Sequence, residues 1–352
     1  MVQYLEVAGW ISLSICSSTS LILMMKLLKR RLTCNYNYSL STLHFLGTWA
    51  FLEILHLAGK INRPSNVPIS KRVLLAFLVM MSIVSMNFNL AYNSIGFYQM
   101  SKLCAVPYMI VWNFFVKKVR YSWEELLSLC ILLCGVALFS ISDVELNFTG
   151  FIIAAVAVLS TAHNQMYTNQ YQKDYQCNGP ELQLCIMPIE FSFGLLTSFI
   201  FELRTGNSLI TQEYTPKLVF LTLGTVFFAI GVNLATFGLI GKTSSITYQV
   251  VGHFKTVLLL VLGYIFFPSH FESTSQLVRA IAGIILALFG VFMYTVVKLR
   301  IAKKNEEEHQ PLLESNKQEP GKNNEKFEEN PIVLQSEEQF EIVHEEDANS
   351  TN

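Results

Sequence analysis

The chain has 352 residues, of which 52% are hydrophobic and 26 are phenylalanine, while charged residues make up only 14%. Soluble domains carry about a quarter charged residues, so this composition excludes an ordinary soluble protein and favours one that places apolar side chains in a lipid bilayer. The formal net charge of −1 averages two unlike segments: residues 1–299 hold 19 Lys and Arg against 12 Asp and Glu, whereas residues 300–352 hold 6 against 14.

Ten apolar runs are each long enough for a helix to cross the hydrocarbon layer, which takes about 20 residues. They lie at 6–28, 40–58, 73–92, 96–116, 123–141, 148–168, 182–202, 218–239, 244–267 and 276–298. The first run lacks a basic flank and a small-residue cleavage site, so we predict a membrane span rather than a cleaved signal peptide. The sequence thus predicts an all-α polytopic membrane protein, with one ten-helix transporter domain at 1–299.

The orientation follows from the basic residues of the short loops. Ten spans put both termini on one side, and that side collects thirteen Lys and Arg residues against at most six on the other. We therefore predict that both termini are cytoplasmic, although Lys29, Arg30 and Arg31 lie on the opposite side.

The last segment, 300–352, is rich in Glu, Asn, Gln and Lys and has few aromatic residues. Such a composition cannot bury a core, so we predict a disordered acidic cytoplasmic tail. Within it, Glu308, Leu312 and Leu313 match an acidic dileucine pattern, which makes a sorting adaptor a candidate partner. A chance match is the alternative.

Two lysines fall inside predicted membrane spans. Lys102 follows Tyr98 by four residues, and Lys255 follows Tyr248 by seven, so each lysine shares a helix face with its tyrosine. A charge at mid-bilayer costs about 3 kcal/mol on insertion scales, which makes such residues candidates for function. The alternative is that each lysine extends its ammonium to the membrane surface, which fits Lys255 poorly because the twelve residues between it and Pro268 are apolar or small.

The tripeptide Asn-Leu-Ala begins at Asn89 and again at Asn233, each time in the span before a Tyr-Gln helix. Two corresponding halves are typical of internally repeated transporters. Because each half would hold an odd number of helices, we predict two five-helix inverted repeats.

Other polar residues within the spans have a structural interpretation beside a functional one. Glu53 and Glu190 could pair with a lysine or relay a proton, and a structural ion pair is the alternative. For His44, a packing or hydrogen-bonding role stands beside proton transfer. No metal-ligand pattern, catalytic Ser-His-Asp arrangement or cofactor motif appears, so we predict neither an enzyme nor a nucleic-acid partner.

Two segments carry a family resemblance: NSIGFYQMSK at 93–102 and IGKTSSITYQVVGHFKT at 240–256. They resemble the fourth-helix and ninth-helix signatures of the nucleotide-sugar transporter and triose-phosphate translocator family, within the drug/metabolite transporter superfamily. The resemblance spans residues 6–298 and is strongest to the UDP-xylose and UDP-rhamnose/UDP-galactose carriers. It implies alternating access and exchange of a luminal nucleoside monophosphate for a cytosolic nucleotide sugar in the Golgi or ER membrane.

Sugar-phosphate members of that family carry Lys-Arg where this chain has Lys255 and Thr256. The loss of the arginine removes one fixed charge and a bidentate donor, which favours a nucleotide sugar over a compact phosphorylated triose. Our hypothesis is that Lys102 and Lys255 bind the phosphate oxygens. Candidate contacts to sugar or base are Thr256, Tyr98, Tyr248, Asn89 and Asn233.

The resulting prediction is a UDP-sugar antiporter that uses UMP as the exchanged nucleotide, with UDP-xylose and UDP-galactose as candidate substrates. One alternative is an exchanger of small phosphorylated metabolites, such as phosphoenolpyruvate, triose phosphate or pentose phosphate, for phosphate. Another is a membrane scaffold or trafficking protein that does not transport. Membrane lipid and a second copy of the chain are further candidate partners.

Overall fold

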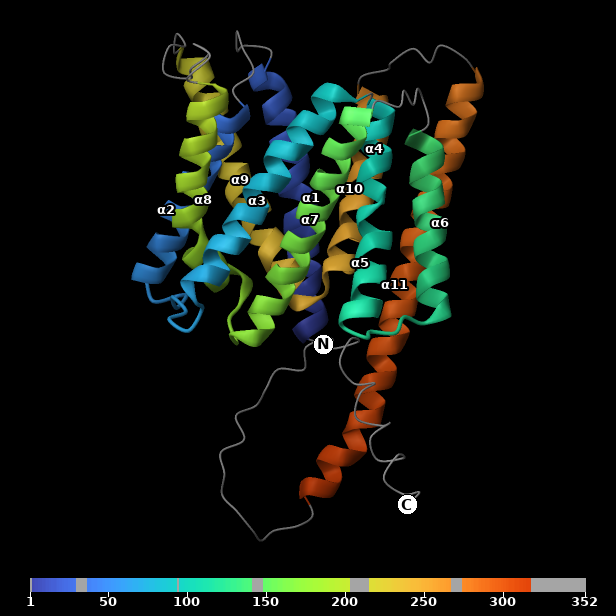
Figure 1. Ribbon diagram of the computed structural model, residues 1–352. Helices are drawn as coiled ribbons and strands as arrows, with labels where there is room; N and C mark the ends of the chain where they lie inside the picture. The colour runs from blue at the N-terminus through green and yellow to red at the C-terminus, as the bar shows by residue number, and fades with distance from the viewer. Residues whose placement is uncertain are drawn as a thin grey trace. The chain divides into compact units, whose positions relative to one another are not determined.

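The computed structural model describes residues 2–29, 37–93, 95–140, 148–202, 215–266 and 274–317. These residues form eleven α-helices and no strand (Figure 1). The helices are α1 (Val2–Lys29), α2 (Asn37–Leu57), α3 (Ile69–Tyr92), α4 (Ile95–Leu103), α5 (Ala105–Val116), α6 (Trp123–Ser140), α7 (Phe148–Asp174), α8 (Gly179–Phe201), α9 (Pro216–Lys242), α10 (Ser245–Phe266) and α11 (Thr274–Lys317).

Five helical stretches in the described part of the chain are long and apolar enough to cross a membrane. They are Tyr4–Met25, Ile69–Tyr92, Gly179–Phe201, Pro216–Lys242 and Ile281–Ile301. Ser101–Val116 is a shorter apolar stretch. The prediction of an all-helical polytopic membrane protein is therefore supported by length and composition.

The predicted span 96–116 is two helices, because α4 ends at Leu103 and α5 begins at Ala105. Pro107 explains the break. It has no backbone N–H to bond the carbonyl of Leu103, and its ring crowds that carbonyl. The chain makes a tighter turn instead, in which the N–H of Cys104 donates to the carbonyl of Ser101 at 3.1 Å.

The last helix differs from expectation in its length. α11 continues to Lys317, beyond residue 299 where we expected the transmembrane domain to end. The backbone of Glu308, Leu312 and Leu313 is therefore helical, and residues 318–352 of the expected tail lie outside the described residues.

The chain divides into two compact units, and its first passage from one to the other falls inside α5. The first unit comprises residues 1–109 and 141–269, and the second comprises 110–140 and 270–352. In the first unit, α1 packs against α9 and α10, α2 against α8 and α9, and α3 against α7 and α8, while α4 packs against α7. In the second, α6 packs along α11.

Three glycines set the antiparallel packing of α9 (gold) on α1 (dark blue) (Figure 1). They are spaced seven residues apart and face three α1 side chains in reverse order. A Cβ on each would lie 2.6 to 2.9 Å from its neighbour. The pairs are Gly224 with Met24, Gly231 with Ser17, and Gly238 with Trp10. This close approach fixes which residues of the two helices lie at the same depth.

Polar side chains close one end of the same unit. Asn169 of α7 donates to the carbonyl of Ile240 at 2.6 Å, and Gln172 donates to that of Phe237 at 3.0 Å. The last four carbonyls of a helix have no partner within the helix, so the Asn169 amide satisfies one of them at the end of α9, and Gln172 adds a bond one turn earlier. Nearby, Asn178 and Glu181 form a reciprocal capping box that begins α8.

Candidate functional site

Lys255 lies ten residues into α10, which ends eleven residues further on. Its ammonium nitrogen donates to the hydroxyl oxygen of Ser14 at 3.0 Å and to that of Ser18 at 3.4 Å, both on α1. The same nitrogen lies 5.4 Å from the ring centroid of Tyr248. The side chain is therefore directed across to α1 and held there by two hydroxyls and an aromatic face.

The two predicted neighbours of Lys255 make different contacts. The hydroxyl of Tyr248 lies 3.2 Å from that of Thr236 on α9, so its ring is tied to a second helix. The hydroxyl of Thr256 donates to the backbone carbonyl of Gly252 at 3.1 Å. Thr256 therefore keeps its oxygen lone pairs as acceptors while its proton is engaged within α10.

Lys102 lies in the last turn of α4, directly before the break at Cys104. Its ammonium nitrogen is 4.5 Å from the ring centroid of Tyr98. The unpaired carbonyls at a helix C-terminus carry partial negative charge, which favours a cation at this position. The predicted sharing of one face by lysine and tyrosine is confirmed in both helices.

Asn89 is fully buried and takes part in a hydrogen-bond network between α3 and α4. Its amide donates to the hydroxyl of Ser101 at 2.8 Å, and its carbonyl oxygen accepts from the amide of Asn93 at 2.8 Å. The hydroxyl of Ser101 in turn donates to the carbonyl of Tyr98 at 2.8 Å. In this structure Asn89 therefore holds α4 in place and faces no open space.

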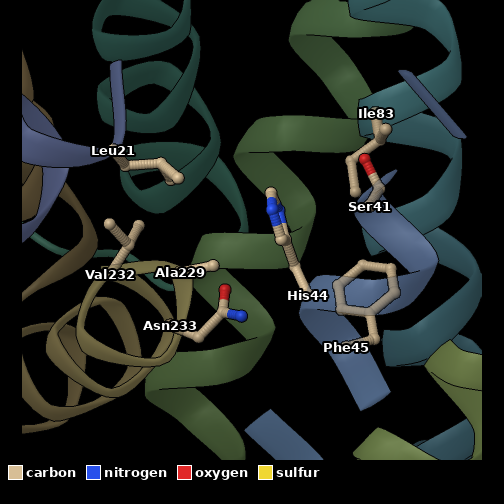
Figure 2. A pocket seen from close by; sticks show the side chains of 8 residues that line it. All are labelled: Leu21, Ser41, His44, Phe45, Ile83, Ala229, Val232 and Asn233. Atoms are coloured by element: carbon tan, nitrogen blue, oxygen red, sulfur yellow. The ribbon is translucent and has the colours of Figure 1, made fainter. Parts of the chain in front are cut away.

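Asn233 has a different setting. Its amide donates to the hydroxyl of Thr48 on α2 at 2.9 Å, and its side chain lines a cavity of about 120 Å³. The other polar residues of the lining are Ser41 and His44, and Figure 2 shows the Asn233 amide beside the His44 imidazole. The apolar wall consists of Leu21, Phe45, Ile83, Ala229 and Val232. Asn233 and Asn89 are thus equivalent in the sequence pattern but not in their surroundings.

The two glutamates predicted to lie within the spans also differ. Glu53 forms an ion pair with Arg63 and accepts from the indole of Trp49 at 2.8 Å, so it has the structural ion pair that was one of its two interpretations. Glu190 is only 1% exposed, and its Oε1 has no hydrogen-bond partner among the described residues.

The serine partners of Lys255 and the residues that line the cavity with Asn233 were not predicted as site residues. Ser14 and Ser18 are four apart on one face of an apolar helix, which is a signal that a polar partner lies opposite. Which partner it is depends on the packing of α1 against α10. Ser41, like Ser14 and Ser18, belongs to no sequence motif that would mark it as a site residue.

The described bundle of long apolar helices, with a lysine hydrogen-bonded inside it, defines the class as a helical polytopic membrane protein. A family model described as the triose-phosphate transporter family matches residues 6–295. The chain belongs to this family.

Curated relatives match most of the chain. It is 34% identical to UDP-xylose transporter 1 of Arabidopsis thaliana, over 82% of this chain and 83% of the relative. It is 30% identical to UDP-rhamnose/UDP-galactose transporter 2 of the same plant, over 85% of each. A solved structure described as "Crystal structure of protein" is similar with a TM-score of 0.62 at 12% identity, covering 82% of this chain and 98% of that one, which shows the same fold.

Proposed function

We propose that this protein is a nucleotide-sugar antiporter, which moves a UDP-sugar into the Golgi or ER lumen in exchange for UMP by alternating access. The relatives named as UDP-xylose and UDP-rhamnose/UDP-galactose transporters support this substrate class. The observation that carries the proposal is the position of the Lys255 ammonium, mid-helix and hydrogen-bonded to Ser14 and Ser18. A diphosphate is the ligand part that a cation inside a membrane bundle is suited to bind.

Lys102 provides the second cation. It lies at the interruption between α4 and α5, and discontinuous helices are common at transporter binding sites. Each ammonium lies over a tyrosine ring, so each combines a charge for phosphate oxygens with an aromatic surface for a sugar or a base. Thr256 is a further contact in this proposal.

The helix contacts support two repeated halves, α1–α6 and α7–α11, in which α4 and α5 together count as one span. In that correspondence α1 matches α7, α2 matches α8, α3 matches α9 and α4 matches α10. The contact of α1 with α9 then corresponds to that of α7 with α3, the contact of α2 with α9 to that of α8 with α3, and the contact of α1 with α10 to that of α7 with α4. All of these pairs are in contact. Five spans per half would make the repeats inverted, with both termini cytoplasmic.

Exchange rather than one-way flow follows from the charge of the empty site. Two lysines without an anion between them are costly inside a membrane, so the protein should reorient mainly when it is loaded. The same property predicts that efflux of UMP and uptake of the UDP-sugar occur in equal amounts.

Counterflow in proteoliposomes tests the proposal. Vesicles are loaded with UMP, GMP or inorganic phosphate, and labelled nucleotide sugars are added outside. UMP-driven uptake of a UDP-sugar that is lost in Lys255→Ala and kept in Lys60→Ala is the expected result, since Lys60 lies exposed in the turn after α2. Uptake of phosphorylated metabolites that only phosphate drives would favour the small-metabolite exchanger, and no uptake of any kind would favour a scaffold.

A further inference from the structure

We propose that one end of the second unit, where the loop between α5 and α6 lies beside α11, binds the phosphate headgroups of anionic phospholipids. Three exposed basic residues carry the proposal: Lys118 and Arg120 of the loop, and Arg300 of α11. The ligand is a lipid of the surrounding leaflet and not the transported molecule, so the inference goes beyond the proposed function and does not depend on it.

The loop and α11 meet at the level of a lipid surface. Lys298 of α11 and Glu125 in the first turn of α6 form an ion pair of 2.6 Å, so the loop before α6 lies beside the part of α11 that follows residue 298 (Figure 1). Phe115 at the end of α5 is 74% exposed, and Trp123 at the start of α6 is 79% exposed. Exposed tryptophans are enriched where the acyl chains meet the headgroups. The loop residues between these two rings therefore lie at headgroup level.

This end of the unit carries an excess of positive charge. Segments 117–125 and 298–304 hold seven Lys and Arg residues against two Glu. Arg300, Lys303 and Lys304 are exposed and share one face of α11, because they are three and four residues apart. The acidic run at 306–308 begins about 9 Å further along the helix axis, away from the apolar stretch. Cytoplasmic termini, as predicted above, put this basic end at the leaflet that carries anionic lipids.

The arginines of this end differ in their contacts from two arginines of the first unit. Arg63 is paired with the carboxylate of Glu53, and Arg72 donates to the carbonyl of Val67 at 2.9 Å. Arg120 and Arg300 make no hydrogen bond or ion pair with the residues that the structure describes. A guanidinium donates two parallel hydrogen bonds to a phosphate, so two such groups at a membrane surface suit phospholipid headgroups.

Lys118 has a backbone conformation that favours glycine. Its φ is 54°, and it follows the end of α5, where glycine is the preferred residue for this conformation. The loop is held in place, because the N–H of Val119 donates to the carbonyl of Asn113 at 3.1 Å and the Asn113 amide donates to the Tyr121 hydroxyl at 2.8 Å. A side chain at positive φ costs stability. A lysine at such a position indicates a use for its ammonium outside the protein fold.

Thermal melting of the purified full-length protein in a non-ionic detergent tests the proposal. Short-chain phosphatidylserine and short-chain phosphatidylcholine are titrated separately, and the rise in melting temperature gives an apparent Kd for each lipid. A basic residue near an anionic surface strengthens association about fivefold, so three of them should make the wild type prefer phosphatidylserine by about a hundredfold. Salt at about 1 M should remove most of this preference.

Three variants locate the site. Arg120→Gln with Arg300→Gln should raise the apparent Kd for phosphatidylserine about thirtyfold. Lys60→Gln with Lys217→Gln removes the same charge at two exposed positions of the first unit and should leave that Kd unchanged. Lys118→Gly separates binding from folding. Its melting temperature without lipid should rise, because glycine adopts a positive φ without strain, while its Kd should rise about fivefold.

Equal Kd values for the two lipids in the wild type would overturn the proposal, and so would an arginine double variant that keeps the wild-type preference. A Lys118→Gly variant that binds phosphatidylserine as tightly as the wild type would also contradict it. Inorganic phosphate is the third titration. If it raised the melting temperature as much as phosphatidylserine does, and the arginine double variant abolished that rise, the site would bind a soluble anion and the assignment to lipid would be wrong.

Discussion

The ammonium nitrogen of Lys255 lies 3.0 Å from the hydroxyl oxygen of Ser14, 241 positions earlier in the chain. This contact joins the ninth predicted span to the first, and it gives a cation inside the bundle a neutral partner instead of a counter-ion. A lysine paired with a carboxylate would resist an incoming phosphate. One held by two serines keeps its charge available for an anion.

The two serines should therefore affect affinity without abolishing transport. In Ser14→Ala with Ser18→Ala, the ammonium is no longer fixed and must be ordered when the substrate binds, which costs about 0.5–1.5 kcal/mol. We expect KM for the UDP-sugar to rise about threefold to tenfold, measured by counterflow, while Lys255→Ala abolishes exchange. Ser12→Ala, at an exposed position on the same helix, is the matched control. An unchanged KM in the double variant would contradict the role given to these hydroxyls.

The break before α5 should be needed for Lys102. In Pro107→Ala the carbonyl of Leu103 regains a hydrogen-bond donor, so α4 and α5 can join into one helix. That moves Lys102 out of the last turn, and we expect exchange to fall about tenfold or more while thermal stability in detergent rises or stays the same. Pro188→Ala is the control, because α8 continues through its proline and Lys102 is unaffected. Normal exchange in Pro107→Ala would show that the break has no role in transport.

The packing of α9 on α1 should tolerate no side chain at its centre. A Cβ at Gly231 would lie 2.9 Å from that of Ser17, so Gly231→Leu forces the helices apart and costs about 1–3 kcal/mol. We expect a lower melting temperature of the purified protein and weaker exchange, since the same helices carry the Lys255 contact and the cavity. Gly9→Leu is the comparison, because no atom lies within 4 Å of a Cβ there. Equal melting temperatures for the two variants would show that the close approach does not stabilise the bundle.

Hydrophobic length predicted the helices well, because crossing a bilayer imposes a minimum apolar run that is visible in one dimension. The pairing of Lys102 with Tyr98 and of Lys255 with Tyr248 was also predictable, because residues four or seven apart share a face of a helix whatever the helix packs against. The break at Cys104 was missed, although Pro107 was a local signal for it. Apolar composition continues through the break and conceals it.

Other parts of the candidate site depend on contacts between distant spans. No pattern near Asn89 or Asn233 says that one is enclosed in a network with Ser101 while the other lines a cavity. The difference arises because α3 is covered by α4, whereas α9 faces α2 across the space beside His44. The cavity and the serine partners of Lys255 exist only once the helices pack, so they could not be read from local sequence.

Cys177 provides a prediction about the loop between α7 and α8. The side chain is 9% exposed, and burial, followed by the nearby Glu181 carboxylate, raises the pKa of its thiol from 9.0 to about 12. Because the thiolate is the reactive form, Cys177 of the folded protein should react with maleimide at pH 8 much more slowly than the new thiol of a Ser65→Cys variant, which lies exposed in the α2–α3 loop. A denaturant should abolish the difference.

The raised pKa also means that the Cys177 thiol loses its proton at a lower pH in the unfolded chain than in the folded protein. The contribution of the protonated Cys177 thiol to the free energy of unfolding should thus be full below about pH 9 and should decline as the pH rises toward 12. Rapid labelling of Cys177 in the folded protein would contradict both expectations and would show that the loop opens.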